Sequence, residues 1–385
     1  FAPGDQLAQH WVIEGGDAVA LGHAAVDATP VTVAGFAVQR QGAGGGEEVV
    51  IRVFGVQPHL DGVANQRHLI LADRQRFTTG DADLPGDQIQ AGDQVNPMAL
   101  SPDGKVLFAA LRVKPFQVLG YRIDRQSGRL TKFTQAPLAE SMAYLSTDRK
   151  GRYLLAASYG ADTLSVQKIG EDQQPSADIV RYKTGLHAHS LRTDPSNRFA
   201  YAGNLGTDHV LQYRFDAATG ALTPIGSGYV SVPANTGPRH LAFSANGKYL
   251  YVVGEMSGTV TAFAIDDSTG ALTQIGVANG IPERLKLAHG EVRDARNNDL
   301  KDDPTPRIWA ADLRLSPDGK LLLMSERTSS SVSAFAVDTA TGGLRFVDNY
   351  PVEEKQPRNI AFSPNGHWLL VTGEKSDKVG TYAVS

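Results

Sequence analysis

Ionisable residues recur at fixed offsets from a repeated turn, and these residues could do chemistry. Eight positions before the turn residue the sequence has Asn96, Ala143, His189, Arg239, Ala311 and Arg358. Eight positions after it come Arg112, Tyr159, Leu205, Glu255, Arg327 and Glu374. Residues equally far from a tight turn lie opposite each other in an antiparallel pair, so the two sets should be neighbours. Convergent ionisable groups in a concave place indicate a functional site, because burial and mutual charge shift their pKa values.

Other readings of these residues remain open. An Arg/Glu ring at a wet channel mouth can be a purely structural ion-pair network. His187 and His189 share a strand face and could be metal ligands, but no carboxylate ring accompanies them, so we expect neither a metal nor another cofactor. His240 should point to the strand face opposite to Arg239, which favours a structural role. His367 lies in a turn and should be solvated.

A repeated hairpin must position these residues. Its turn residues are Gly104, Gly151, Asn197, Gly247, Gly319 and Gly366, spaced 47, 46, 50, 72 and 47 residues apart. All six are of the types that tolerate positive φ. A second turn, D-x-x-[ST]-G-x-L, recurs at 124–130, 216–222, 266–272 and 338–344, which gives four antiparallel strands per repeat. Such units in series stack around an axis, so the sequence predicts an all-β protein with a β-propeller fold.

Six blades are recognisable, and their predicted limits are 95–140, 141–185, 186–235, 236–281, 308–354 and 355–385. The last blade is incomplete, because the sequence stops at the end of its third strand. An insertion at 281–307 should be a loop with a short helix near 283–288. We expect it to cover the face that carries the ionisable residues, where Arg307, His289 or Glu291 could touch a ligand.

Residues 1–94 differ in kind from the propeller domain at 95–385. Residues 1–100 contain no Lys, Ser or Tyr, although average usage would supply several of each. Apolar patches occur at 30–38 and 48–54, but no copy of the repeat does. This N-terminal segment is either a divergent extension or sequence translated out of frame up to about residue 92. We expect that it does not form a regular blade.

Composition excludes several classes of partner. The net charge is −4 and no Lys/Arg run resembles a phosphate-tracking stripe, so a nucleic acid is not expected. No apolar run approaches the ~20 residues that span a bilayer, and no membrane partner is expected. The absence of Cys and of a secretory signal pattern predicts a cytoplasmic protein. The sequence leaves the oligomeric state open.

An ordered set of motifs resembles the seven-bladed propeller lactonase family over about 93–385. The motifs are NPMALSPDGK, HAHS, TGPRHLAFS, the Glu of VVGE, RIWAADLRLSPDGK, the Arg of MSERT and QPRNIAFSPNG. The resemblance implies an active-site cluster at His189, Arg239, Glu255 and Arg327. Beside that cluster we expect Arg358, Arg112, Arg307 and His187 to bind the substrate. The aromatic-rich first strands of the family have no counterpart in residues 1–92.

The activity that the resemblance implies is hydrolysis of a small anionic sugar lactone, namely 6-phosphogluconolactone to 6-phosphogluconate in the pentose phosphate pathway. Arg239 and Arg327 could hold a phosphate or carboxylate and offset the oxyanion that forms at the ring carbonyl. Glu255, kept ionised by the arginines, or a neutral His189 could take the proton from water. The alternatives are a muconate-type cycloisomerase and a non-catalytic propeller that binds a protein or a small anion at the channel mouth.

Overall fold

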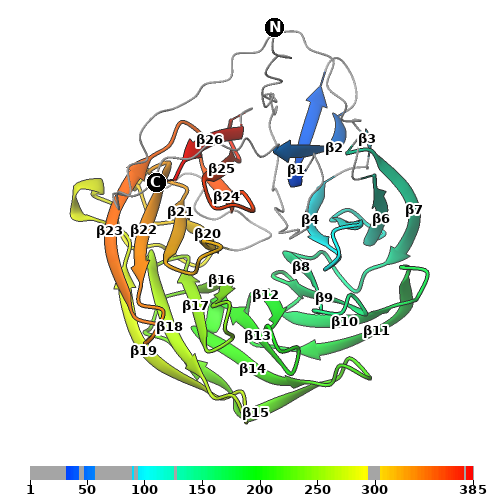
Figure 1. Cartoon of the computed structure of the whole chain (residues 1–385), viewed down its shortest axis with the longest axis horizontal. Helices are drawn as coiled ribbons and strands as arrows, with labels where there is room; N and C mark the ends of the chain where they lie inside the picture. The colour runs from blue at the N-terminus through cyan, green and yellow to red at the C-terminus, as the bar shows by residue number, and fades with distance from the viewer. Residues whose placement is uncertain are drawn as a thin grey trace, which may run out of the picture.

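The computed structural model describes the backbone of residues 32–42, 47–56 and 89–90. It describes residues 94–124, 128–293, 304–376 and 379–384 in full. The described strands form five four-stranded and two three-stranded sheets, and in every sheet the strands follow one another in chain order. Figure 1 shows the sheets arranged around a central axis like blades. The predicted all-β propeller fold is therefore confirmed.

The strands of the first three four-stranded blades are β4 (Val95–Leu100), β5 (Val106–Leu111), β6 (Gln117–Ile123), β7 (Leu130–Pro137), β8 (Tyr144–Thr147), β9 (Tyr153–Ser158), β10 (Thr163–Ile169), β11 (Pro175–Lys183), β12 (Ala188–Thr193), β13 (Phe199–Asn204), β14 (His209–Phe215) and β15 (Leu222–Ser231). The remaining three blades contain β16 (Pro238–Phe243), β17 (Tyr249–Gly254), β18 (Thr259–Ile265), β19 (Leu272–Asn279), β20 (Ala310–Leu315), β21 (Leu321–Glu326), β22 (Ser331–Val337), β23 (Leu344–Pro351), β24 (Pro357–Phe362), β25 (Trp368–Gly373) and β26 (Val379–Ala383). These limits agree with the six predicted blades, and the last sheet has three strands in the described residues.

The first strand of each blade lies nearest the axis. Strands β4, β8, β12, β16, β20 and β24 contact one another in that order around the centre. The apolar core lies between blades, since each of five clusters of buried side chains draws residues from two neighbouring blades. Each of the four middle blades therefore buries both of its faces against its neighbours, and the first and the last blade each bury one face in this way, which is why no blade could be stable alone.

The hairpin turns have the conformation that the alignment requires. All six turn residues have positive φ, between 61° at Asn197 and 76° at Gly366. The side chain three positions before the turn residue closes each hairpin: Ser244 Oγ accepts the N–H of Tyr249 at 2.9 Å, and Asp194 Oδ1 accepts that of Phe199 at 2.8 Å. Only serine or aspartate occupies this position in the six copies, because both supply a short oxygen acceptor.

The predicted register, in which residues equally far from the turn residue pair, is wrong by one residue in the hairpin of β16 and β17. Phe243 pairs with Leu250, so the hairpin is centred between Asn246 and Gly247. Farther from the turn Pro238 pairs with Gly254 and Leu241 with Val252, which leaves two residues opposite one. This is a β-bulge, and similar shifts interrupt β4, β12, β20 and β24. Each shift includes the position eight before the turn.

The N-terminal part contains three described strands, β1 (Thr32–Gly42), β2 (Glu47–Val56) and β3 (Ile89–Gln90). They form one antiparallel sheet, and the first two strands coincide with the apolar patches at 30–38 and 48–54. In Figure 1 this sheet lies between the blade of β24 and the blade of β4. The remainder of residues 1–93 lies outside the described residues, so the origin of this segment stays a prediction.

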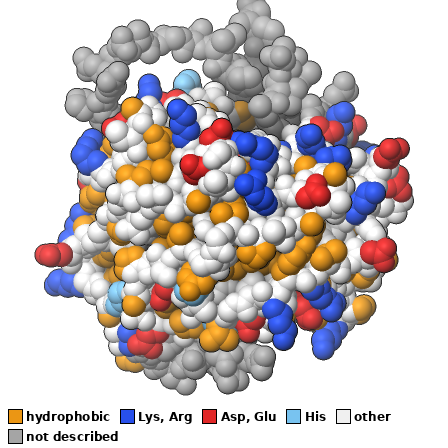
Figure 2. All heavy atoms as spheres, turned by 90° about the horizontal axis from the view of Figure 1, so that it is seen from below, with side chains coloured by type: hydrophobic (Ala, Val, Ile, Leu, Met, Phe, Trp, Pro, Cys, Tyr) orange, Lys and Arg blue, Asp and Glu red, His pale blue; other side chains and the backbone are white. Residues whose placement is uncertain are grey.

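The insertion between β19 and β20 contains the short 3₁₀ helix η2 (Glu283–Leu285), as expected near 283–288. A second 3₁₀ turn, η1 (Leu205–Thr207), follows β13. Figure 2 shows the rim of the disc from below, with hydrophobic side chains interspersed among acidic and basic ones. Exposed apolar residues on the outer strands β15 and β19, such as Tyr229 and Val277, are ordinary for a protein surface.

Candidate active site

A cavity of about 450 Å³ occupies the channel and is lined by residues from all six described blades and from the insertion. Among the described residues, its lining carries eight arginines, which are Arg112, Arg149, Arg192, Arg239, Arg293, Arg314, Arg327 and Arg358. Two carboxylates, Asp148 and Glu255, belong to the same lining. This excess of positive charge favours an anionic ligand.

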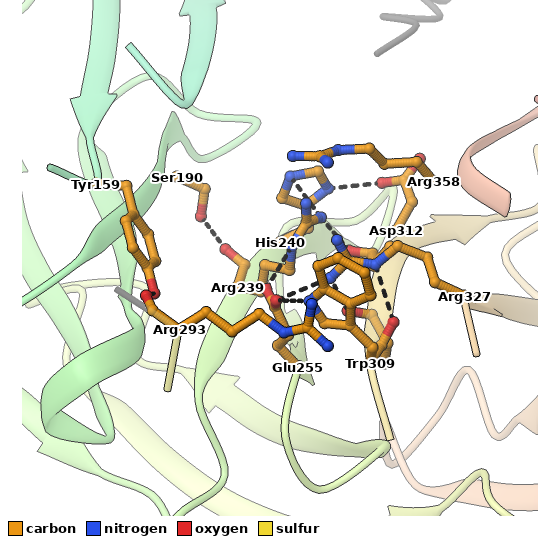
Figure 3. Close-up of polar contacts among 12 residues, drawn as sticks. Tyr159, Ser190, Arg239, His240, Glu255, Arg293, Trp309, Asp312, Arg327 and Arg358 are labelled. Carbon is orange, nitrogen blue, oxygen red and sulfur yellow. Dashed lines mark hydrogen bonds and ion pairs between the residues drawn. The ribbon is translucent and has the colours of Figure 1, made fainter. Parts of the chain in front are cut away.

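Glu255 joins two arginines at the centre of the site (Figure 3). It follows β17, and its Oε2 lies 2.7 Å from Nε of Arg239 on β16. Its Oε1 accepts hydrogen bonds from Arg327 Nη2 at 2.8 Å and from the indole Nε1 of Trp309. Arg239 and Arg327 are 2% and 1% exposed. Both carboxylate oxygens are thus engaged by protein groups.

Mutual charge decides the ionisation of this cluster. Burial alone would raise the pKa of Glu255, but Arg327, Arg239 and Arg358 hold it below its usual value. Burial lowers the pKa of Arg239, and it lowers that of Arg327 to about 9 even though Glu255 acts in the opposite direction. At neutral pH the cluster is therefore a carboxylate flanked by charged guanidinium groups.

His189 supplies a neutral imidazole to the same cavity. It lies in the irregular part of β12, and its ring meets the rings of His240 and Tyr159 edge-on at centroid distances of 5.3 and 5.9 Å. Burial lowers its pKa well below 6.5, and Arg239 adds to this effect. Its Nδ1 is buried without a hydrogen-bond partner among the described residues. Such an imidazole can accept a proton from a bound molecule.

The expectation that His240 points away from Arg239 is wrong. His240 lines the cavity, and its Nε2 lies 3.1 Å from Arg239 Nη1. The bulge of β16 is the physical reason, because two residues opposite one no longer alternate between the sheet faces. His240 Nδ1 lies 2.8 Å from Oδ1 of Asp312, a fully buried carboxylate on β20.

The Asp312 contact fixes the tautomer of His240. A carboxylate can only accept, so Nδ1 carries the proton and Nε2 accepts from Arg239. Burial, reinforced by the charge of Arg239, lowers the pKa of His240 to about 3, so the ring is neutral. Asp312 Oδ2 lies 3.1 Å from Arg314 Nη2, and Arg314 with His240 keeps the pKa of Asp312 low against its burial. Arg239 Nη1 also donates to the carbonyl of Ala311 in the next blade.

The other expected site residues divide into two groups. Arg358 and Arg112 line the cavity, where Arg358 Nη1 donates to Glu374 at 2.9 Å and Arg112 Nε to Ser141 at 3.2 Å. The cavity lining does not include His187 or Arg307. His187 stacks on Tyr159 at 4.1 Å, behind the cavity wall. Arg307 forms an ion pair with Glu291 at 2.8 Å and holds the two ends of the insertion together.

Trp309 and Arg293 belong to the site but were not singled out from the sequence. Trp309 precedes β20, and the guanidinium carbons of Arg293 and Arg327 lie over its ring at 3.5 and 3.7 Å from the centroid. Trp309 stands in the RIWAADL motif, ten positions before the turn residue, and so lies outside the two positions that the spacing selects. Arg293 lies in the insertion, which has no counterpart in the repeat.

The described residues contain no group of three or more His, Cys, Asp or Glu side chains placed to hold a metal ion. Within the same part of the chain, no helix has the length and apolar character that crossing a bilayer requires.

Comparison with known proteins gives consistent matches. Residues 71–385 match the family described as "Lactonase, 7-bladed beta-propeller". The 6-phosphogluconolactonase of Serratia proteamaculans (strain 568) is 33% identical over 296 residues, which cover 77% of this chain and 82% of that protein. The 6-phosphogluconolactonase of Pectobacterium carotovorum subsp. carotovorum (strain PC1) is 33% identical over 302 residues, with 78% and 82% covered.

A solved structure with the same fold is the periplasmic gluconolactonase PpgL of Pseudomonas aeruginosa. It superposes with a TM-score of 0.63 at 30% sequence identity, and the match covers 74% of this chain and 80% of that one. The relatives thus carry names of lactonases for a phosphorylated and an unphosphorylated substrate.

Proposed function

This chain belongs to the family of seven-bladed β-propeller lactonases, and from that premise we propose that it hydrolyses 6-phosphogluconolactone to 6-phosphogluconate. One observation carries the proposal: the pair of buried arginines that Glu255 bridges lies beside a neutral histidine in an arginine-lined cavity. That arrangement suits an anionic ester whose carbonyl oxygen becomes negatively charged during reaction.

In the proposed reaction His189 acts as the base. Its neutral imidazole takes a proton from water while the water oxygen attacks the ring carbonyl. Arg239 and Arg327 stabilise the resulting oxyanion, since their charges are fixed before the reaction begins. When the bond between the carbonyl carbon and the ring oxygen breaks, the imidazolium returns the proton to that oxygen. The product is an open-chain acid, which then ionises.

Glu255 is proposed as the group that positions the arginines. Both of its oxygens are engaged by Arg239, Arg327 and Trp309, and the arginines hold its pKa low. Its oxygens are therefore already occupied, whereas Nδ1 of His189 is buried without a hydrogen-bond partner among the described residues. Of the two candidates that the sequence offered for the base, this geometry favours His189.

A turnover assay tests the function. Purified protein is given 6-phosphogluconolactone at neutral pH, and lactone loss is corrected for spontaneous hydrolysis. We expect rapid loss that His189→Gln abolishes. Gluconolactone and a muconate, followed by its change in absorbance, are assayed in parallel. Turnover of the muconate alone would show that the protein is a cycloisomerase and not a lactonase. If none of the three compounds is turned over, a non-catalytic binding protein is the remaining alternative.

The cytoplasm is the compartment that we propose, because a phosphorylated sugar carries charges that keep it on the side of the membrane where it is made. Cell fractionation tests this, and recovery of the protein in the periplasm would place it with the gluconolactonase named above.

A further inference from the structure

We propose that Arg293, held against the ring of Trp309 by the insertion, binds the phosphate group of the substrate, so that the insertion determines preference for a phosphorylated lactone. This inference rests on the proposed function, which needs a phosphate subsite but does not say where it lies. Arg239 and Arg327 are assigned to the reacting carbonyl, and the phosphate is carried by C6, which is attached to the ring carbon on the other side of the ring oxygen.

The insertion is fastened at several places, and these contacts determine where Arg293 lies. At its base Ala288 and Arg307 form a bridge, and the Gly290 N–H donates to Met256 O at 2.8 Å. A Cβ on Gly290 would lie 2.5 Å from the carbonyl oxygen of Ile308, so only glycine permits this approach. Across the channel, the hydroxyl of Tyr159 in the second blade donates to the Arg293 carbonyl at 2.7 Å.

Trp309 gives the Arg293 guanidinium a fixed plane on which to lie (Figure 3). Arg293 and Arg327 both lie over the indole within 3.7 Å of its centroid. Two guanidinium groups cannot share one ring face at such distances, so they occupy opposite faces. The indole is itself held by its Nε1 bond to Glu255 and by a backbone bond from Trp309 N to Glu326 Oε1 at 2.8 Å. A stacked guanidinium directs its N–H groups outward in its own plane, which suits bidentate binding of phosphate.

The charges gathered at this indole favour a bound anion. Glu255 already bridges Arg239 and Arg327, and Arg293 brings a third guanidinium to the other side of the same indole. Like charges so close repel one another, and a phosphate dianion would offset that repulsion.

The bonds of the three arginines separate their roles. Arg239 and Arg327 donate to backbone carbonyls of the strands or of the residues next to them, at Ala311, Trp309 and Ala310. Arg293 is carried by the insertion instead. The geometry therefore assigns the strand arginines to the reacting centre and Arg293 to the phosphate group.

Three variants test the assignment: Arg293→Gln, Tyr159→Phe, which removes the hydroxyl that donates to the Arg293 carbonyl, and Arg284→Gln as the matched control. Arg284 also belongs to the insertion but is exposed and pairs with Asp348 at 2.8 Å, away from the cavity. Steady-state kinetics are measured with 6-phosphogluconolactone and with gluconolactone, and each variant is checked for an unchanged melting temperature.

We expect Arg293→Gln to raise KM for the phosphorylated lactone by about tenfold or more, the usual effect of losing charge-assisted hydrogen bonds, with kcat nearly unchanged. KM for gluconolactone should not change in this variant. Tyr159→Phe should raise KM for the phosphorylated lactone selectively but by a smaller factor. Arg284→Gln should have the same KM values as the parent protein. Equal effects on both lactones, or no effect on either, would overturn the assignment.

Calorimetric binding of 6-phosphogluconate and gluconate separates this inference from the proposed function. If neither lactone is turned over, the proposed activity fails, yet selective weakening of 6-phosphogluconate binding in Arg293→Gln would still support the subsite. If the parent protein binds the two acids equally well, the subsite is wrong even if turnover is observed.

Discussion

Arg239 Nη1 lies 3.1 Å from His240 Nε2, although the two residues are neighbours in one strand. In a regular strand their side chains would point to opposite faces of the sheet. The bulge in β16 brings both into the channel, and Asp312 of the next blade then orients the imidazole. The position of Arg239 is therefore set partly by its own neighbour.

This contact makes His240 a positioning residue for Arg239. His240→Leu removes the acceptor for Arg239 Nη1, and we expect kcat to fall by about tenfold or more with a smaller change in KM. His240→Gln can still offer an acceptor at the same distance from the backbone, so it should recover much of the loss. Steady-state kinetics measure both variants. Equal activity of His240→Leu and His240→Gln would show that the acceptor for Arg239 Nη1 does not affect the reaction.

Glu255 should support both activity and stability. Glu255→Gln leaves Arg239 and Arg327 buried without their carboxylate, so we expect a loss of about 3–5 kcal/mol in the free energy of unfolding. The turnover rate should fall by about 10² or more. Urea denaturation and lactone assays measure the two effects. Glu291→Gln breaks a half-exposed pair with Arg307 and should cost less than about 1 kcal/mol; a similar loss in both variants would refute the central role of Glu255.

Acid should destabilise the protein below about pH 6.5 through the buried histidines His189 and His240. Burial lowers the pKa of His189 well below 6.5 and that of His240 to about 3. A histidine with a lowered folded-state pKa binds more protons when unfolded. Its stabilising contribution is therefore complete above pH 6.5 and is lost as the pH falls toward the folded-state pKa. Each histidine can contribute up to about 1.4 kcal/mol per pH unit.

Denaturation at several pH values between about 6.5 and 5 measures this effect before carboxylates begin to titrate. His240→Gln should reduce the dependence of stability on pH, whereas His367→Gln, at an exposed turn, should leave it unchanged. A parent protein whose stability is constant over this range would contradict the prediction.

Asn197 has a second role beyond accepting positive φ. Its Nδ2 donates to Asp148 Oδ2 at 2.8 Å, and its Oδ1 accepts the N–H of Arg149 at 2.9 Å, so it joins two neighbouring blades. Asn197→Gly preserves the backbone conformation but removes both bonds, and we expect a loss of about 1–3 kcal/mol. Gly247→Asn is the matched control, because a Cβ there meets nothing closer than Pro195 at 3.8 Å. If the free energy of unfolding does not change in Asn197→Gly, Asn197 serves only as a turn residue.

The repeat made the fold predictable, because the hairpin turns and the second turn recur at regular spacing and their glycines require positive φ. The same spacing placed His189, Arg239, Glu255 and Arg327 among twelve ring positions, and the resemblance to the lactonase family singled out these four, which the structure brings into one cavity. It could not reveal the bulges, because a bulge depends on how two strands pair and leaves no fixed residue pattern. His240 was misassigned for that reason. Arg293 was missed because the contacts that place it, from Tyr159 and Met256, come from distant parts of the sequence.

The recurrence of the bulge at one height in five inner strands also bears on how such a protein can change its substrate. Below the bulge each inner strand alternates, so a change of side chain disturbs the packing between blades. At the bulge the side chain leaves that alternation, and Asn96, His189, Arg239, Ala311 and Arg358 differ in size and charge while the strands around them remain alike. The side chain at this level is therefore not constrained by the alternation that fills the core, so the blades of one scaffold can carry different groups at the same height.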